Sequence, residues 1–282
     1  MRYIHRYALT LLGMSLLFGI FVLLSHRLIF SGLLTGLLCI LAHFIHQAKF
    51  NTLNEPLTFA DLRLYLQVFQ FPHFYLPFIN AKVLIGGALL SLSILFGLIY
   101  IEAPLMFFNI SPYISSVYFV SFLLLLAIVG YLYTSMVPFT QQIQQDFATY
   151  GLLANIVLYA FQNVKATKQL PQECMLQLPT KVQHSPIICI QSESYFDLRK
   201  MLPGFKQSSL DAYYQAFDRL KEQSMQQGYL AVPSWGAYTM RSEFALLTGI
   251  KNQALRLGQY DPLRFYQNKK LPSLVWQLKQ QG

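Results

Sequence analysis

Charged side chains are scarce in this chain: only 12% of its 282 residues are Asp, Glu, Lys or Arg, whereas 54% belong to the hydrophobic set. A soluble globular domain carries roughly a quarter charged residues, and a disordered chain is poor in apolar ones. The composition therefore excludes both an ordinary soluble protein and a disordered one. It predicts a membrane protein with a soluble part.

Cysteine is also rare. Cys39, Cys174 and Cys189 are too few and too scattered to form a disulfide framework or a zinc ligand set. The net charge of +9 divides into +3 for residues 1–136 and +6 for residues 137–282. A basic balance beside a bilayer favours anionic headgroups or a phosphorylated lipid as the partner. Nucleic acid fits less well, because the basic residues are interleaved with acids.

Long apolar runs are abundant. Four windows approach the roughly 20 apolar residues that a membrane helix needs, at 7–25, 28–46, 83–103 and 117–137. None of them contains an ionised residue away from its ends, and the first outruns the apolar part of a cleavable signal. We therefore expect a polytopic α-helical membrane domain over residues 1–137.

Two further segments favour the membrane surface. Residues 47–82 are rich in aromatic rings and prolines, which favours an interfacial helix and loop, with a re-entrant segment over 64–79 as the alternative. Residues 146–162 carry apolar side chains at helical spacing but are too short to span. They predict an amphipathic helix on the membrane that, with a proline-dotted linker, couples the two halves over residues 138–185.

Residues 186–282 have the pattern of an α/β domain. Short apolar runs at 187–191 and 229–232 predict strands, and helical spacing predicts helices at 209–227, 240–248 and 274–281. This order favours helices covering a parallel sheet. Two strands are too few for a sheet buried on both faces, so the α/β domain is expected to be incomplete, with the chain stopping inside it.

Two polar residues follow the predicted strands. Glu193 comes just after the first, and Thr239 begins the helix that follows the second. Ligands of open parallel sheets gather at the carboxyl ends of the strands, and a helix N-terminus favours a phosphate. A metal held by Glu193 would activate the Thr239 hydroxyl as a nucleophile. Simple capping or turn roles are the alternatives. Arg241 could clamp a phosphate or pair with an acid such as Glu243.

The stretch I-Q-S-E-S-Y-F-D and the later G-A-Y-T-M-R-S-E-F-A-L-L-T-G resemble the lipoteichoic acid synthase-like phosphoglycerol transferases of the alkaline phosphatase and sulfatase superfamily. The segment E-P-L-T-F-A-D-L, residues 55–62, resembles a stretch that these enzymes carry between membrane spans. The resemblance implies that Glu193 binds a divalent ion, manganese or magnesium, and that Thr239 joins it as the nucleophile. It also implies a phosphatidylglycerol-like donor and a glycan or glycolipid acceptor outside the cell membrane.

The chain departs from this family in two ways. The family completes its metal site with an Asp-His pair and a further histidine, but only His184 lies near the soluble segment. We therefore expect a fragment or remnant that does not turn over by itself. The family has five spans and an external catalytic domain, whereas four are counted here. Either residues 64–79 cross the membrane or the N-terminus lies outside.

The sequence suggests three candidate functions. The first is a metal-dependent transferase of the cell membrane that moves phosphoglycerol or phosphoethanolamine to an envelope glycan through a phospho-threonine. The second is a non-catalytic membrane fragment or pseudoenzyme that binds lipid or a partner. The third, a small transporter, depends on His43 and His46, whose place at the end of a span favours interfacial anchoring instead.

Overall fold

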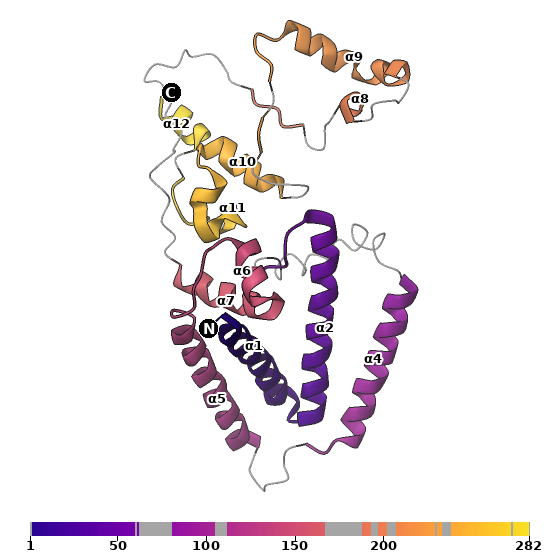
Figure 1. Ribbon diagram of the computed structural model, residues 1–282, viewed down its shortest axis with the longest axis vertical. Helices are drawn as coiled ribbons and strands as arrows, with labels where there is room; N and C mark the ends of the chain where they lie inside the picture. Colours follow the sequence, from indigo (N-terminus) through magenta and orange to yellow (C-terminus); the bar gives the residue numbers. More distant parts are fainter. Residues whose placement is uncertain are drawn as a thin grey trace.

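Four long helices form the membrane half of the computed structural model (Figure 1). The structure describes residues 2–59, 61, 81–104, 112–166, 188–192, 197–201, 207–228, 230–232, 238–271 and 273–281. The four helices are α1 (Arg2–Ser25), α2 (Leu28–Leu53), α4 (Ala81–Ile101) and α5 (Pro112–Tyr133). Each overlaps one of the four predicted spans. Among the described residues, α1, α2 and α5 are long and apolar enough to cross a membrane, while α4 adds the shorter apolar stretch Ile85–Ile101.

Reciprocal capping joins the start of α2 to the end of α4. The Glu102 carboxylate accepts hydrogen bonds from the backbone N–H groups of Ile29 (2.6 Å) and Phe30 (2.8 Å). The Arg27 guanidinium donates to the carbonyl of Leu98 in the last turn of α4 and to that of Glu102 just after it. Each charge complements the helix dipole it faces. Helices α2 and α4 are therefore antiparallel, and α2 ends at the same end of the bundle where α4 begins (Figure 1). The residues predicted to re-enter or cross, 64–79, lie outside the described part.

The predicted helix at 146–162 is two helices, α6 (Ile143–Tyr150) and α7 (Leu152–Lys165). Gly151 separates them with φ 78° and ψ −177°, a conformation that residues other than glycine rarely adopt. Predicting one continuous helix was therefore wrong, because the helical spacing did not show this break. Helix α7 packs against α1, and Leu9, Ala154 and Leu158 form a buried core between them.

The soluble half is helical in its described part. Its elements are α8 (Leu198–Met201), α9 (Gln207–Gln223), α10 (Thr239–Thr248), the 3₁₀ segment η5 (Asn252–Gln259), α11 (Pro262–Phe265) and α12 (Leu274–Gln281). The helices predicted at 209–227, 240–248 and 274–281 correspond to α9, α10 and α12. Gly249, at φ 72°, ends α10 as the sequence suggested. A small core of Phe244, Ile250, Leu255 and Tyr266 holds α10, η5 and α11 together.

The predicted parallel sheet is not supported. Neither residues 188–192 nor residues 230–232, the described parts of the two predicted strands, form a strand, and the rest of the described chain contains none either. Ile188 and Ile190 are 82% and 87% exposed, so their apolar side chains are not buried against any element that the structure describes. A strand requires a hydrogen-bonded partner, and these two segments do not pair with each other. The β-branched residues therefore indicated a local preference for strand, but the described segments have no partner strand to pair with.

Candidate functional site

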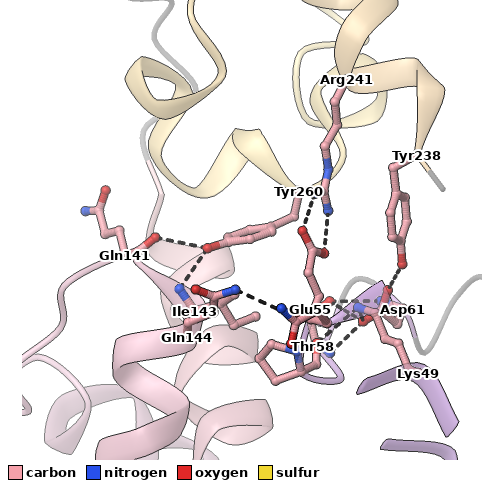
Figure 2. A network of polar contacts seen from close by, with 12 residues as sticks. Lys49, Glu55, Thr58, Asp61, Gln141, Ile143, Gln144, Tyr238, Arg241 and Tyr260 are labelled. Atoms are coloured by element: carbon pink, nitrogen blue, oxygen red, sulfur yellow. Dashed lines mark hydrogen bonds and ion pairs between the residues drawn. The ribbon is translucent and has the colours of Figure 1, made fainter. Parts of the chain in front are cut away.

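Glu55, Thr58 and Asp61 of the membrane motif at residues 55–62 lie beside the start of helix α10, as Figure 2 shows. Arg241 of α10 forms a two-pronged ion pair with Glu55, with Nη1 to Oε1 at 2.7 Å and Nη2 to Oε2 at 3.2 Å. Its side chain is 4% exposed, and that of Glu55 is 21% exposed. Paired geometry of this kind is among the stronger charge-assisted contacts in proteins. It fixes the first turn of α10 against the loop that leaves α2.

A second polar cluster lies beside this pair and centres on Asp61. One carboxylate oxygen accepts from Lys49 Nζ at 2.6 Å and from the backbone N–H and hydroxyl of Thr58 at 2.6 and 2.8 Å. The other accepts from the Tyr238 hydroxyl at 2.6 Å. The side chains of Lys49 and Asp61 are 4% and 5% exposed. Asp61 therefore closes the turn in the loop and connects it to the residue just before α10.

Residues of helices α2 and α6 also contact the loop after α2. His46 Nδ1 accepts a hydrogen bond from the Leu57 N–H at 3.2 Å, and its ring centroid lies 4.7 Å from that of Phe147. Gln144 donates to the Asn54 carbonyl at 3.3 Å. The loop is therefore held by elements on both sides of it, which makes it a rigid platform for α10.

Two tyrosines flank the Arg241 guanidinium. Its central carbon lies 4.4 Å from the ring centroid of Tyr238 and 5.6 Å from that of Tyr260. The Tyr260 hydroxyl accepts from the Ile143 N–H at 2.9 Å and donates to the Gln141 carbonyl at 3.2 Å. Burial raises the pKa of Tyr260 to about 12, and burial also raises the pKa of Tyr238. Both phenols are therefore neutral hydrogen-bond donors at physiological pH, and their rings favour a cation between them.

Thr239, the predicted nucleophile, is the first residue of α10, and its side chain is exposed. It is not the cap residue, because Tyr238 occupies that position in the left-handed region at φ 68° and ψ 43°. Such a conformation is uncommon for a residue with a side chain and often marks a functional site. Here the Asp61 contact holds Tyr238 in place. The prediction that Thr239 stands at a helix N-terminus is confirmed, while its chemical role stays a prediction.

The acid that pairs with Arg241 is Glu55 of the membrane half and not Glu243, the partner that the sequence suggested. Glu243 instead accepts a hydrogen bond from Gln191 at 2.9 Å. This contact places the start of the I-Q-S-E stretch beside α10. Glu193 itself, the predicted metal ligand, lies outside the described residues.

A metal site stays a prediction. The described residues contain no group of three or more His, Cys, Asp or Glu side chains that could hold a metal ion. Of the two predicted ligands, only Thr239 is described. A hydroxyl and a carboxylate oxygen are ligands that magnesium and manganese accept, so the chemistry of the predicted pair fits these ions.

Sequence reasoning missed most of the residues that build this junction, namely Lys49, Glu55, Asp61, Tyr238 and Tyr260. The signal that pointed toward them was the E-P-L-T-F-A-D-L motif, which contains both acids. No periodicity or spacing connects that motif to a helix almost 180 residues later in the chain, since their contact depends on how the two halves pack.

Comparison with known proteins gives one curated relative. The chain is 26% identical over 258 residues to the capsular polysaccharide biosynthesis protein RkpI of Rhizobium meliloti (strain 1021). The alignment covers 84% of this chain and 46% of RkpI, so the chain spans about half the length of that relative. No protein-family profile matches the chain, and no solved structure matches it. The chain is thus similar to a capsular polysaccharide biosynthesis protein from the membrane helices into the soluble segment.

Proposed function

We propose that this chain is part of a membrane transferase in envelope polysaccharide biosynthesis. It moves a phosphoglycerol or phosphoethanolamine group from a phospholipid to an envelope glycan or glycolipid, through a phosphorylated Thr239. The observation that carries the proposal is the Arg241–Glu55 ion pair, because it places the start of α10 against the loop at the end of the membrane helices. The similarity to RkpI, whose name is that of a capsular polysaccharide biosynthesis protein, supports the same process.

The electrostatics of the junction suit an anionic headgroup. Thr239 stands at the positive end of the α10 dipole, where phosphates bind favourably. Arg241 lies two residues further on, and its Nε–H is buried without a hydrogen-bond acceptor in the described structure. An unsatisfied buried donor is unfavourable by about 1–3 kcal/mol. A phosphate oxygen that reached this group after a small rearrangement would remove that penalty.

The proposed reaction has two balanced steps. The Thr239 oxygen attacks the phosphorus of the lipid, the bond from phosphorus to the diacylglycerol oxygen breaks, and the proton lost by Thr239 is balanced by one gained by diacylglycerol. A hydroxyl of the acceptor then attacks the same phosphorus, the bond to Thr239 breaks, and the threonine hydroxyl recovers a proton. A divalent metal bound by Glu193 and Thr239 would favour the deprotonated hydroxyl in the first step.

The test uses membranes of cells that express the protein from its own gene, supplied with phosphatidylglycerol labelled in its headgroup. We expect labelled protein, with the label on Thr239. Thr239→Ala removes the label, Thr239→Ser keeps it because the hydroxyl is retained, and Thr149→Ala on α6 serves as the matched control. Label that persists in Thr239→Ala overturns the mechanism. An unlabelled wild type in intact membranes overturns the transferase and favours the non-catalytic alternative.

A further inference from the structure

A pocket of about 160 Å³ lies between the loop after α2 (the membrane loop, residues 54–59 and 61), α7 and the η5–α11 segment. It is separate from the ion pair but adjacent to it, because Tyr260 both lines the pocket and flanks Arg241. Its lining combines aromatic rings with amide, hydroxyl and charged groups. These groups include the side chains of Thr58, Tyr159, Asn163, Tyr260, Asp261 and Arg264.

Hydrogen bonds hold the two tyrosine rings that line the pocket, Tyr159 and Tyr260. The Tyr159 hydroxyl donates to Asp146 Oδ2 at 3.0 Å, and Asp146 is 1% exposed. The Tyr260 hydroxyl is held by the backbone of residues 141 and 143, as described above. The two rings meet edge to face, with centroids 6.0 Å apart. The rings therefore have little freedom to collapse into the space, and the pocket is preformed.

Several polar side chains of the pocket lining have no hydrogen-bond partner among the described residues. The side chains of Asn163, Arg264 and Gln267 form no hydrogen bond or ion pair within the described part of the chain, and all three line the pocket. Asp261 uses one carboxylate oxygen to cap α11, at 3.3 Å from the Arg264 N–H. The lining has one positive and one negative side chain, so its net charge is zero.

We infer that this pocket binds one sugar ring of the acceptor, an inference that rests on the proposed function. A volume of about 160 Å³ equals that of roughly five waters in the liquid, at about 30 Å³ each, which suits a single sugar ring better than a long acyl chain. Zero net charge disfavours a diphosphate. Aromatic faces for the C–H groups of a sugar, and amide and carboxylate groups for its hydroxyls, are the mixture that the pocket presents. Tyr260 places the bound ring next to Arg241, close to the start of α10.

The test measures sugar binding without any reaction. The full chain in nanodiscs is photolabelled with a diazirine derivative of methyl glucoside, and the labelled peptides are mapped by mass spectrometry. We expect label within residues 257–267, with at least a fivefold decrease in Asn163→Leu and Arg264→Gln. Lys269→Gln, which changes an exposed charge outside the pocket, is the matched control. If either pocket variant unfolds at a lower temperature, Gln267→Ala replaces it.

Competition identifies the source of the sugar. Free methyl glucoside and glucosyl-diacylglycerol placed in the nanodisc are compared as competitors, and stronger competition by the second indicates a glycolipid acceptor. Glycerol phosphate is expected to compete poorly. Label spread evenly over the protein, or unchanged in every pocket variant, overturns the inference. Headgroup labelling of Thr239 in the wild type is a separate measurement, so a labelled Thr239 with no sugar in the pocket overturns only this inference.

Discussion

Replacing Glu55 by glutamine is expected to release α10 from the membrane loop. The substitution keeps the shape of the side chain but removes the charge that compensates Arg241, which is 4% exposed. Breaking one side of a buried ion pair destabilises by about 3–5 kcal/mol, and the partial exposure of Glu55 favours the lower end of that range. At 1.4 kcal/mol for each factor of ten, about 3 kcal/mol corresponds to a roughly 100-fold increase in the opening of α10.

Hydrogen exchange of the α10 amides measures this opening directly. Glu243→Gln is the matched control on the same helix, because its carboxylate makes an exposed hydrogen bond to Gln191 and its loss is expected to be within about 0.5 kcal/mol. The double variant Glu55→Gln with Arg241→Gln removes both charges and is expected to lose less than the sum of the single variants. Equal exchange of α10 in Glu55→Gln and Glu243→Gln would refute the role of the ion pair.

Gly151→Ala is expected to lower the free energy of unfolding by about 1–2 kcal/mol, because φ is 78° and the added carbon would lie 3.4 Å from the Arg6 guanidinium. The control Gly86→Ala has open space around the added carbon and is expected to be neutral or stabilising. Thermal unfolding measures both variants. Burial raises the pKa of Tyr260 from an unfolded value of about 10 to about 12, so its contribution to stability is complete below the lower value and is lost as pH rises through the upper one. Between those two pH values, the unfolding temperature of Tyr260→Phe should therefore fall less steeply with pH than that of the wild type. An identical slope in the two proteins would contradict this. A tag at the N-terminus and a reporter after α7 are expected on the same side of the membrane, and protection of only one of them from external protease would contradict the antiparallel order of the four helices.

The loop after α2 holds the start of α10 against the end of the membrane helices. Glu55 contacts Arg241 of α10, and Asp61 contacts Tyr238 just before that helix, so both acids link the loop to the soluble segment. The contacts of Glu55 and Asp61 with the start of α10 give a physical reason why the motif between the membrane helices occurs together with the motif in the soluble segment.

Composition and periodicity alone determined the four apolar helices, the helix that starts at Thr239 and the glycine that ends it at Gly249. These features depend on local preference and on the absence of charge over about 20 residues, and both can be read along the chain. The break at Gly151 was missed because helical spacing is nearly the same on both sides of it. The predicted sheet was not supported, because a strand depends on a partner that local composition does not specify.

Only the tertiary structure decided how the two motifs are joined. The sequence suggested that Arg241 clamps a phosphate or pairs with an acid such as Glu243, and packing pairs it with Glu55 from the other half of the chain. The pocket between α7 and α11 likewise combines residues about 100 positions apart in the sequence. Such contacts depend on where helices end in space, and that is a property of the packed bundle, which the pattern of any one segment does not contain.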